Sequence, residues 1–285
     1  MNLLRKEDFI GNENKSFIND KYDIHTAIIL NNIGRPIYTF IDGDKDHKKC
    51  RFCDRNENEI TFNHKAHVIP KFLGNFLVLS NSECDECNSY FSKFETELEK
   101  YIKIPLIANK QGNYLKNRYG QNIKRINDDI IVNGKQEIVE FNGLFVLKIF
   151  LKFAYSMLYE SELKYYNNIK KILLDDKSIP LITNILDITT NDTFDWNSVV
   201  LYKKNIDNDK YVDNILSMNF NMKKYIIFFN KDNNKSIIND DTIRENYIRL
   251  FNDIDIYNYR IRNLSHNQHI KFNIDVFMEL IKNEI

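Results

Sequence analysis

The apolar positions near the start of the chain are spaced as in strands. Two short apolar runs, at residues 25–30 and 36–41, lie on either side of a polar stretch that contains Gly34. Such runs around a polar turn predict a β-hairpin. We therefore expect residues 1–46 to form an N-terminal hairpin extension.

A helical period follows, between residues 86 and 103. Apolar side chains recur there at helical spacing, at Tyr90, Phe91, Phe94, Leu98 and Tyr101. This spacing predicts an amphipathic helix that ends before Pro105, because proline disfavours the helical conformation in the residue before it. β-rich stretches with turns at Pro70 and Gly74 precede the helix. The order predicts a small ββα unit within residues 47–102.

The longest apolar stretch, residues 144–158, predicts a buried helix. It is too short to cross a membrane and is interrupted by Lys148 and Lys152. An Asn133-Gly134 pair between apolar runs predicts a hairpin over residues 130–141.

The remaining pattern mixes strands with helix. We expect strands at residues 198–202 and 225–230 and an amphipathic helix at residues 274–282. The predicted fold class is α+β: a small ββα module followed by a larger α+β domain at residues 103–285. The sequence leaves open whether that domain serves recognition, partner binding or oligomerisation.

Composition narrows the class of protein. The 285 residues are 43% hydrophobic and 28% charged, as in a globular protein with a substantial core. Lys and Arg number 40 and Asp and Glu number 40, so binding to nucleic acid would require a local basic patch. The N-terminal residues turn polar after four positions, and we expect a cytoplasmic protein without a signal peptide.

Four cysteines form two CxxC pairs, Cys50 with Cys53 and Cys84 with Cys87, and the chain has no others. Two such pairs suit one tetrahedral Zn²⁺ ion, which can stabilise a segment too small to fold alone. The alternative, a redox CxxC, would be expected within a βαβ pattern that the sequence lacks. A site of four thiolates has no open position, so the predicted zinc is structural.

Between the two pairs lies His67, three residues before Pro70. A neutral imidazole can act as a general base near pH 7. A histidine without a metal, held beside a proline turn, is one way to present such a base. The alternative is a histidine that only forms structural hydrogen bonds.

The ordered set of CxxC at residues 50–53, HxxP at residues 67–70 and CxxCN at residues 84–88 resembles the HNH endonucleases. More narrowly, it is similar to their zinc-stapled branch, which has a ββα-metal fold. The resemblance covers residues 47–102. It implies a phosphodiester hydrolase that uses Mg²⁺ or Mn²⁺ besides the structural zinc.

The resemblance also implies roles for single residues. His67 would be the general base, and Asn88 would bind the catalytic ion, although a helix N-cap is the alternative for Asn88. An asparagine within the motif would brace the hairpin, and of the two candidates, Asn81 and Asn75, Asn81 is preferred.

One position departs from the family pattern. Ala66 stands where many members have an acidic ligand of the catalytic ion. The resemblance then implies an ion held by Asn88, His67 and a substitute ligand. Glu95, two helical turns after Asn88, is our candidate, and His64 and Glu97 are the alternatives. The alternative function is an inactive zinc-containing module that binds nucleic acid or a partner.

The implied substrate is DNA, and four basic residues are candidates to contact it: Lys65, Lys71, Lys116 and Arg118. The basic stretch at residues 110–125 has a solvated connector as its alternative. Free-standing proteins of this family often act in defence against phage or mobile DNA. The resemblance therefore implies a defence partner or an activating ligand, with a homo-oligomer as a further expectation.

Overall fold

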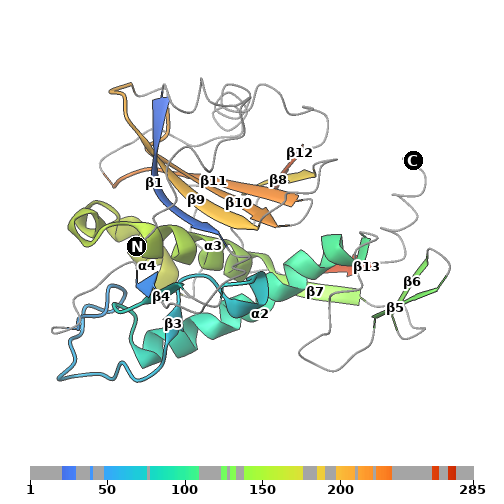
Figure 1. Cartoon of the computed structure of the whole chain (residues 1–285), viewed down its shortest axis with the longest axis horizontal. Helices are drawn as coiled ribbons and strands as arrows, with labels where there is room; N and C mark the ends of the chain where they lie inside the picture. Colours follow the sequence, from blue (N-terminus) through green and yellow to red (C-terminus); the bar gives the residue numbers. More distant parts are fainter. Residues whose placement is uncertain are drawn as a thin grey trace.

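A buried helix separates a six-stranded sheet from the segment that carries the cysteines. The computed structural model describes residues 21–29, 39–40, 48–75, 78–108, 123–126, 129–132, 138–175, 185–189, 197–208, 211–220, 223–232, 259–262 and 269–273. Within these ranges the fold is α+β, as predicted. Helix α3 (Gly143–Met157) lies between the sheet and the long helix α2 (Asp85–Ala108) (Figure 1).

The large sheet is antiparallel throughout, in the order β1-β9-β10-β11-β8-β12. Its strands are β1 (Tyr22–Ile29), β8 (Ile185–Thr189), β9 (Ser198–Lys204), β10 (Asn214–Phe220), β11 (Lys223–Phe229) and β12 (Tyr259–Arg262). The strands predicted at residues 198–202 and 225–230 are confirmed as β9 and β11. The helix predicted at residues 274–282 lies outside the described residues.

The predicted core helix is confirmed as α3. Its first turn is capped by Asn142, whose side-chain oxygen accepts a hydrogen bond from the Phe145 amide at 3.3 Å. Every residue of the helix except Phe145 is buried, including Lys148 and Lys152. The helix is buried all round because the sheet covers one side and α2 the other (Figure 1).

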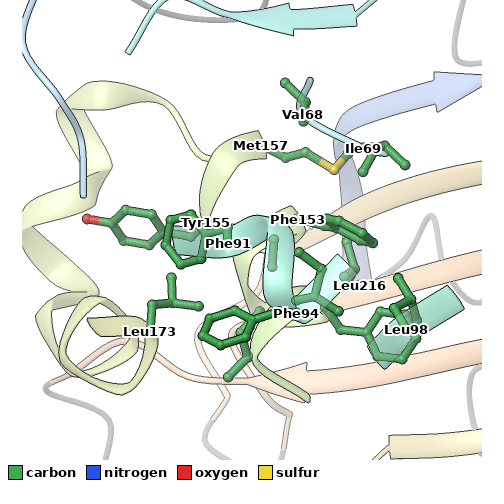
Figure 2. Close-up of a cluster of buried hydrophobic side chains, with 14 of the residues drawn as sticks. Val68, Ile69, Phe91, Phe94, Leu98, Phe153, Tyr155, Met157, Leu173 and Leu216 are labelled. Atoms are coloured by element: carbon green, nitrogen blue, oxygen red, sulfur yellow. The ribbon is translucent and has the colours of Figure 1, made fainter. Parts of the chain in front are cut away.

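One hydrophobic core joins these layers. Figure 2 shows Phe94 and Leu98 of α2, Phe153 of α3 and Leu216 of β10 in one buried cluster. The same cluster includes Cys50, so the cysteine segment shares its core with the sheet and the central helix.

The two apolar runs near the N-terminus lie in different sheets. β1 pairs along its length with β9, whereas β2 (Thr39–Phe40) pairs in parallel with β4 (Val78–Ser80). The predicted hairpin between residues 25–30 and 36–41 is therefore wrong. β1 forms a longer hydrogen-bonded ladder with the edge of the large sheet than the two-residue strand β2 could offer it.

The hairpin predicted over residues 130–141 is also wrong. β6 (Asp129–Val132) pairs with β5 (Ile123–Ile126), and β7 (Ile138–Asn142) pairs with β13 (His269–Asn273). The Asn133-Gly134 pair thus joins strands of two different sheets. The helix predicted to end before Pro105 continues as α2 to Ala108.

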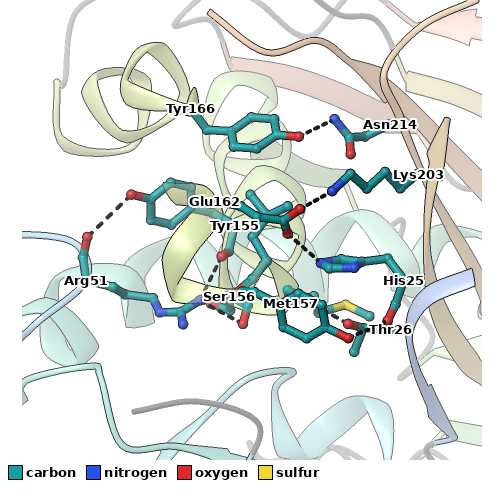
Figure 3. A network of polar contacts seen from close by, with 12 residues as sticks. His25, Thr26, Arg51, Tyr155, Ser156, Met157, Glu162, Tyr166, Lys203 and Asn214 are labelled. Carbon is teal, nitrogen blue, oxygen red and sulfur yellow. Dashed lines mark hydrogen bonds and ion pairs between the residues drawn. The ribbon is translucent and has the colours of Figure 1, made fainter. Parts of the chain in front are cut away.

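Two short elements follow α3, a 3-10 helix η4 (Glu160–Tyr165) and helix α4 (Asn167–Leu174). The Glu162 carboxylate of η4 pairs with Lys203 of β9 and lies 3.0 Å from Nε2 of His25 in β1 (Figure 3). These contacts fasten η4 to the sheet. Among the described residues, none of the helices combines the length and the hydrophobicity that crossing a membrane requires.

Candidate active site

The four cysteine sulfurs form one compact cluster. All four Sγ atoms lie within 4.8 Å of one another, and those of Cys53 and Cys84 are 3.8 Å apart. A tetrahedral zinc ion with Zn–S bonds of about 2.3 Å holds its sulfurs about 3.8 Å apart. The arrangement fits structural zinc bound by Cys50, Cys53, Cys84 and Cys87.

Backbone hydrogen bonds shape each CxxC pair into a turn. The Asp54 amide donates to the Cys50 carbonyl and the Asn88 amide to the Cys84 carbonyl, both at 2.9 Å. Asp54 adopts a left-handed conformation with φ of 62°, which aspartate tolerates better than most residues. The Cys87 amide also points at Cys84 Sγ, at 3.4 Å. Such turns bring the two sulfurs of each pair to the same side.

The thiols are not equivalent in their tendency to ionise. A hydrogen bond from Cys87 lowers the pKa of Cys50 to about 5, although burial opposes this shift. Burial raises the pKa of Cys84 to about 12, and the hydrogen bond with Cys50 raises the pKa of Cys87. Four thiolates this close would repel one another, so a divalent cation is what allows all of them to ionise.

The predicted ββα unit is formed by β3 (Ala66–His67), β4 and α2. β3 runs antiparallel to β4, with His67 opposite Leu79. Between them Pro70 precedes a 3-10 turn, η2 (Lys71–Leu73), which ends at Gly74 with φ of 97°. A residue with a Cβ would be strained at that angle, which explains the glycine.

His67 is half-buried at the end of β3, and no hydrogen-bond partner reaches its buried Nδ1 atom among the described residues. Burial, together with the positive charges of Lys71, Lys152 and Lys65, lowers the pKa of His67 to about 4. The imidazole is therefore neutral at neutral pH and able to accept a proton.

The structure shows Asn75 as the asparagine that braces the loop between β3 and β4. Its buried side-chain amide donates to the carbonyls of Ile69 at 2.7 Å and Val78 at 2.9 Å, and its oxygen accepts from the Val78 amide at 2.9 Å. Asn81, the preferred candidate from the sequence, lies partly exposed just after β4. Asn75 therefore braces this loop.

Asp85 holds the segment that leads into β3, and sequence reasoning missed this residue. Its carboxylate accepts hydrogen bonds from the Thr61 hydroxyl and from the amides of Asn63 and His64. Slight burial opposes ionisation, but these three bonds together lower the pKa of Asp85. The available signal was its place at the first position of the helix that follows Cys84, where an acidic residue is favoured.

Two of the three candidate ligands of a catalytic ion lie on α2. Asn88 and Glu95 are seven residues apart in one helix, hence on one face but about 10.5 Å apart along the axis. Burial, together with the negative charges of Glu95 and Cys50, raises the pKa of Glu83 to about 7, although Lys152 opposes this shift. Among the described residues, only the four cysteines form a metal-ligand cluster of three or more His, Cys, Asp or Glu.

The candidate DNA-binding residues and Ala66 are the remaining positions predicted from the sequence. Lys65 and Lys71 are exposed on either side of His67 in the chain, whereas Lys116 and Arg118 lie outside the described residues. Ala66 is fully buried opposite Ser80, so its position offers no ligand to an ion.

A comparison with known families decides what this unit is. Residues 50–102 match the model of the HNH endonuclease family. The segment is an HNH module. Its four clustered cysteines fit the zinc-binding kind, and the module supports a nuclease function in general. Searches of curated proteins and of solved structures found no match to this chain.

Proposed function

We propose that the protein is a metal-dependent HNH endonuclease that hydrolyses phosphodiester bonds in DNA. The observation that carries this proposal is the environment of His67. The hairpin of the HNH module presents a neutral imidazole whose pKa is lowered by burial and by Lys71, Lys152 and Lys65. A base next to several cations suits a reaction at a polyanionic backbone.

Each residue has a defined task in this proposal. His67 takes the proton from the attacking water, and the exposed Lys65 and Lys71 bind the flanking phosphates, joined by Lys116 and Arg118. Asn88, with His67 and Glu95, would hold Mg²⁺ or Mn²⁺, which offsets negative charge on the phosphate oxygens when bound. Asn75 holds the loop after His67, and Asn81 would support the hairpin end.

Ala66 favours a second candidate function. A fully buried alanine at the position of an acidic ligand suits a module that binds nucleic acid or a partner protein without cleaving. Cleavage assays separate the two, because both functions require zinc and only the first requires His67.

We also propose a role in cytoplasmic defence against foreign DNA. The balance of 40 basic and 40 acidic residues gives the whole chain no broad attraction to DNA. A nuclease of this kind would depend on recruitment by a partner protein, an activating ligand or self-association, for which residues 103–285 are available.

The test is cleavage of supercoiled plasmid by purified zinc-loaded protein with Mg²⁺ or Mn²⁺. We expect nicked or linear product that requires the metal and is lost in His67→Ala with zinc content unchanged. DNA binding without product in any divalent metal, by wild type and His67→Ala alike, would support the second function instead.

A further inference from the structure

We propose that Lys152, on the core helix outside the HNH module, is a positioning residue for His67. The inference rests on the proposed function, because positioning matters only if His67 acts on a substrate. It assigns to α3 a part in the active site that the HNH segment itself does not contain.

The geometry brings one ammonium group into contact with several parts of the module. Lys152 is completely buried, and its Nζ donates a hydrogen bond to the His67 carbonyl at 3.1 Å. The same Nζ lies 3.0 Å from Oε2 of Glu83, which is also completely buried. It lies 5.9 Å from the ring centroid of Phe91 on α2. Lys152 thus joins the strand that carries His67 to the helix of the ββα unit.

His67 needs such an anchor because little else fixes it. Strand β3 is only two residues long, and no partner among the described residues reaches the buried Nδ1 of the imidazole. The orientation of the ring therefore depends on its backbone, where Lys152 binds the carbonyl. A displacement of about 1 Å at a catalytic group is enough to lower a rate about a hundredfold.

A neighbouring lysine on the same helix offers a matched control. Lys148, one turn earlier on α3, is equally buried, but its Nζ bonds to the Asp175 carbonyl and lies 5.4 Å from the Phe94 ring centroid. Because these contacts are with Asp175 and Phe94, Lys148→Met is a matched control for Lys152→Met.

A second variant separates positioning from simple charge neutralisation. Removing Lys152 alone leaves the Glu83 carboxylate buried without its cation, which could unfold the module. The double variant Lys152→Met/Glu83→Met removes both charges, and apolar replacements of buried ion pairs are often neutral or stabilising. It therefore restores packing without restoring the hydrogen bond to His67.

Two readouts test the proposal on the full-length, zinc-loaded protein. The first is the rate at which diethylpyrocarbonate modifies His67, measured by mass spectrometry against the exposed His64 of the same chain, and it needs no cleavage. The second is plasmid cleavage, resolved into kcat and KM.

We expect at least a threefold change in the ratio of His67 to His64 modification in Lys152→Met and in the double variant, but not in Lys148→Met. We also expect kcat to fall at least tenfold in both Lys152 variants, with KM within about twofold of wild type. An unchanged modification ratio overturns the inference, even if the wild-type protein cleaves nothing. Recovery of kcat in the double variant overturns it too, because neutralisation of Glu83 would then be the whole role of Lys152.

Discussion

Arg51 caps the end of the core helix that carries Tyr155. Its Nη1 atom donates to the Tyr155 and Ser156 carbonyls at 2.8 and 2.9 Å, and the Tyr155 hydroxyl donates back to the Arg51 carbonyl at 3.5 Å (Figure 3). Arg51 stands between the zinc-ligand candidates Cys50 and Cys53. The loop that holds the metal is therefore fixed to the last turn of α3, where a positive charge is favoured.

Substitution of Arg51 should destabilise the whole protein. Arg51→Met leaves buried carbonyls at the end of α3 without their charged donor, and we expect a loss of about 2–4 kcal/mol in the free energy of unfolding. Urea denaturation followed by circular dichroism measures it. The control is Arg55→Met in the same loop, whose pair with Glu86 is solvent-exposed and should contribute much less to stability. Equal losses in the two variants would contradict the capping role.

The two asparagines of the motif should differ in their effect on stability. Asn75→Ala removes three hydrogen bonds and leaves the Ile69 and Val78 carbonyls without their donor, so we expect a loss of about 2 kcal/mol or more. Asn81→Ala, at a partly exposed position, should cost less than about 1 kcal/mol. The same denaturation experiment ranks them, and a greater loss for Asn81→Ala would return the bracing role to the residue that the sequence favoured.

The sequence predicts the parts of this protein that are set by local chemistry. Cysteine spacing gives the zinc ligands, because four thiolates and one ion have a single good geometry. Helical periodicity predicts α2, and an apolar run predicts α3, because the backbone hydrogen bonds of a helix form within its own segment. Pro70 and Gly74 mark the turn that presents His67, since their backbone angles are restricted to few conformations.

The parts that sequence reasoning missed depend on partners far along the chain. β1 pairs with β9, about 175 residues away, and nothing near either strand encodes that choice. The charges of Arg51 and Lys152 do not announce their partners in the sequence, yet each side chain is buried against a segment about 70 to 105 residues away. The predicted boundary at residue 102 falls inside α2, which continues without a break to Ala108. Tertiary packing decides each of these features.

The four thiols should be protected as a group. Since the chain has no other cysteines, thiol titration with a disulfide reagent reports on this site alone. We expect one zinc ion per chain by elemental analysis, and no rapidly reacting thiols until a chelator removes it. Four thiols should then react together, with loss of cooperative unfolding, because Cys50 and Cys84 belong to the shared core. Four reactive thiols in zinc-loaded protein would show that the ion lies elsewhere.

The exposed lysines beside His67 should control the salt dependence of DNA binding. Each lysine that neutralises a phosphate adds about 0.9 to the slope of log K against log salt concentration. We therefore expect Lys65→Ala and Lys71→Ala each to reduce the slope by about 0.9, measured by fluorescence anisotropy with duplex DNA and the cleavage-deficient His67→Ala protein. Lys171, exposed on α4 outside the HNH module, supplies the control, and Lys171→Ala should leave the slope unchanged. If all three variants keep the wild-type slope, the phosphates are bound elsewhere, and the basic residues Lys116 and Arg118 become the ones to substitute.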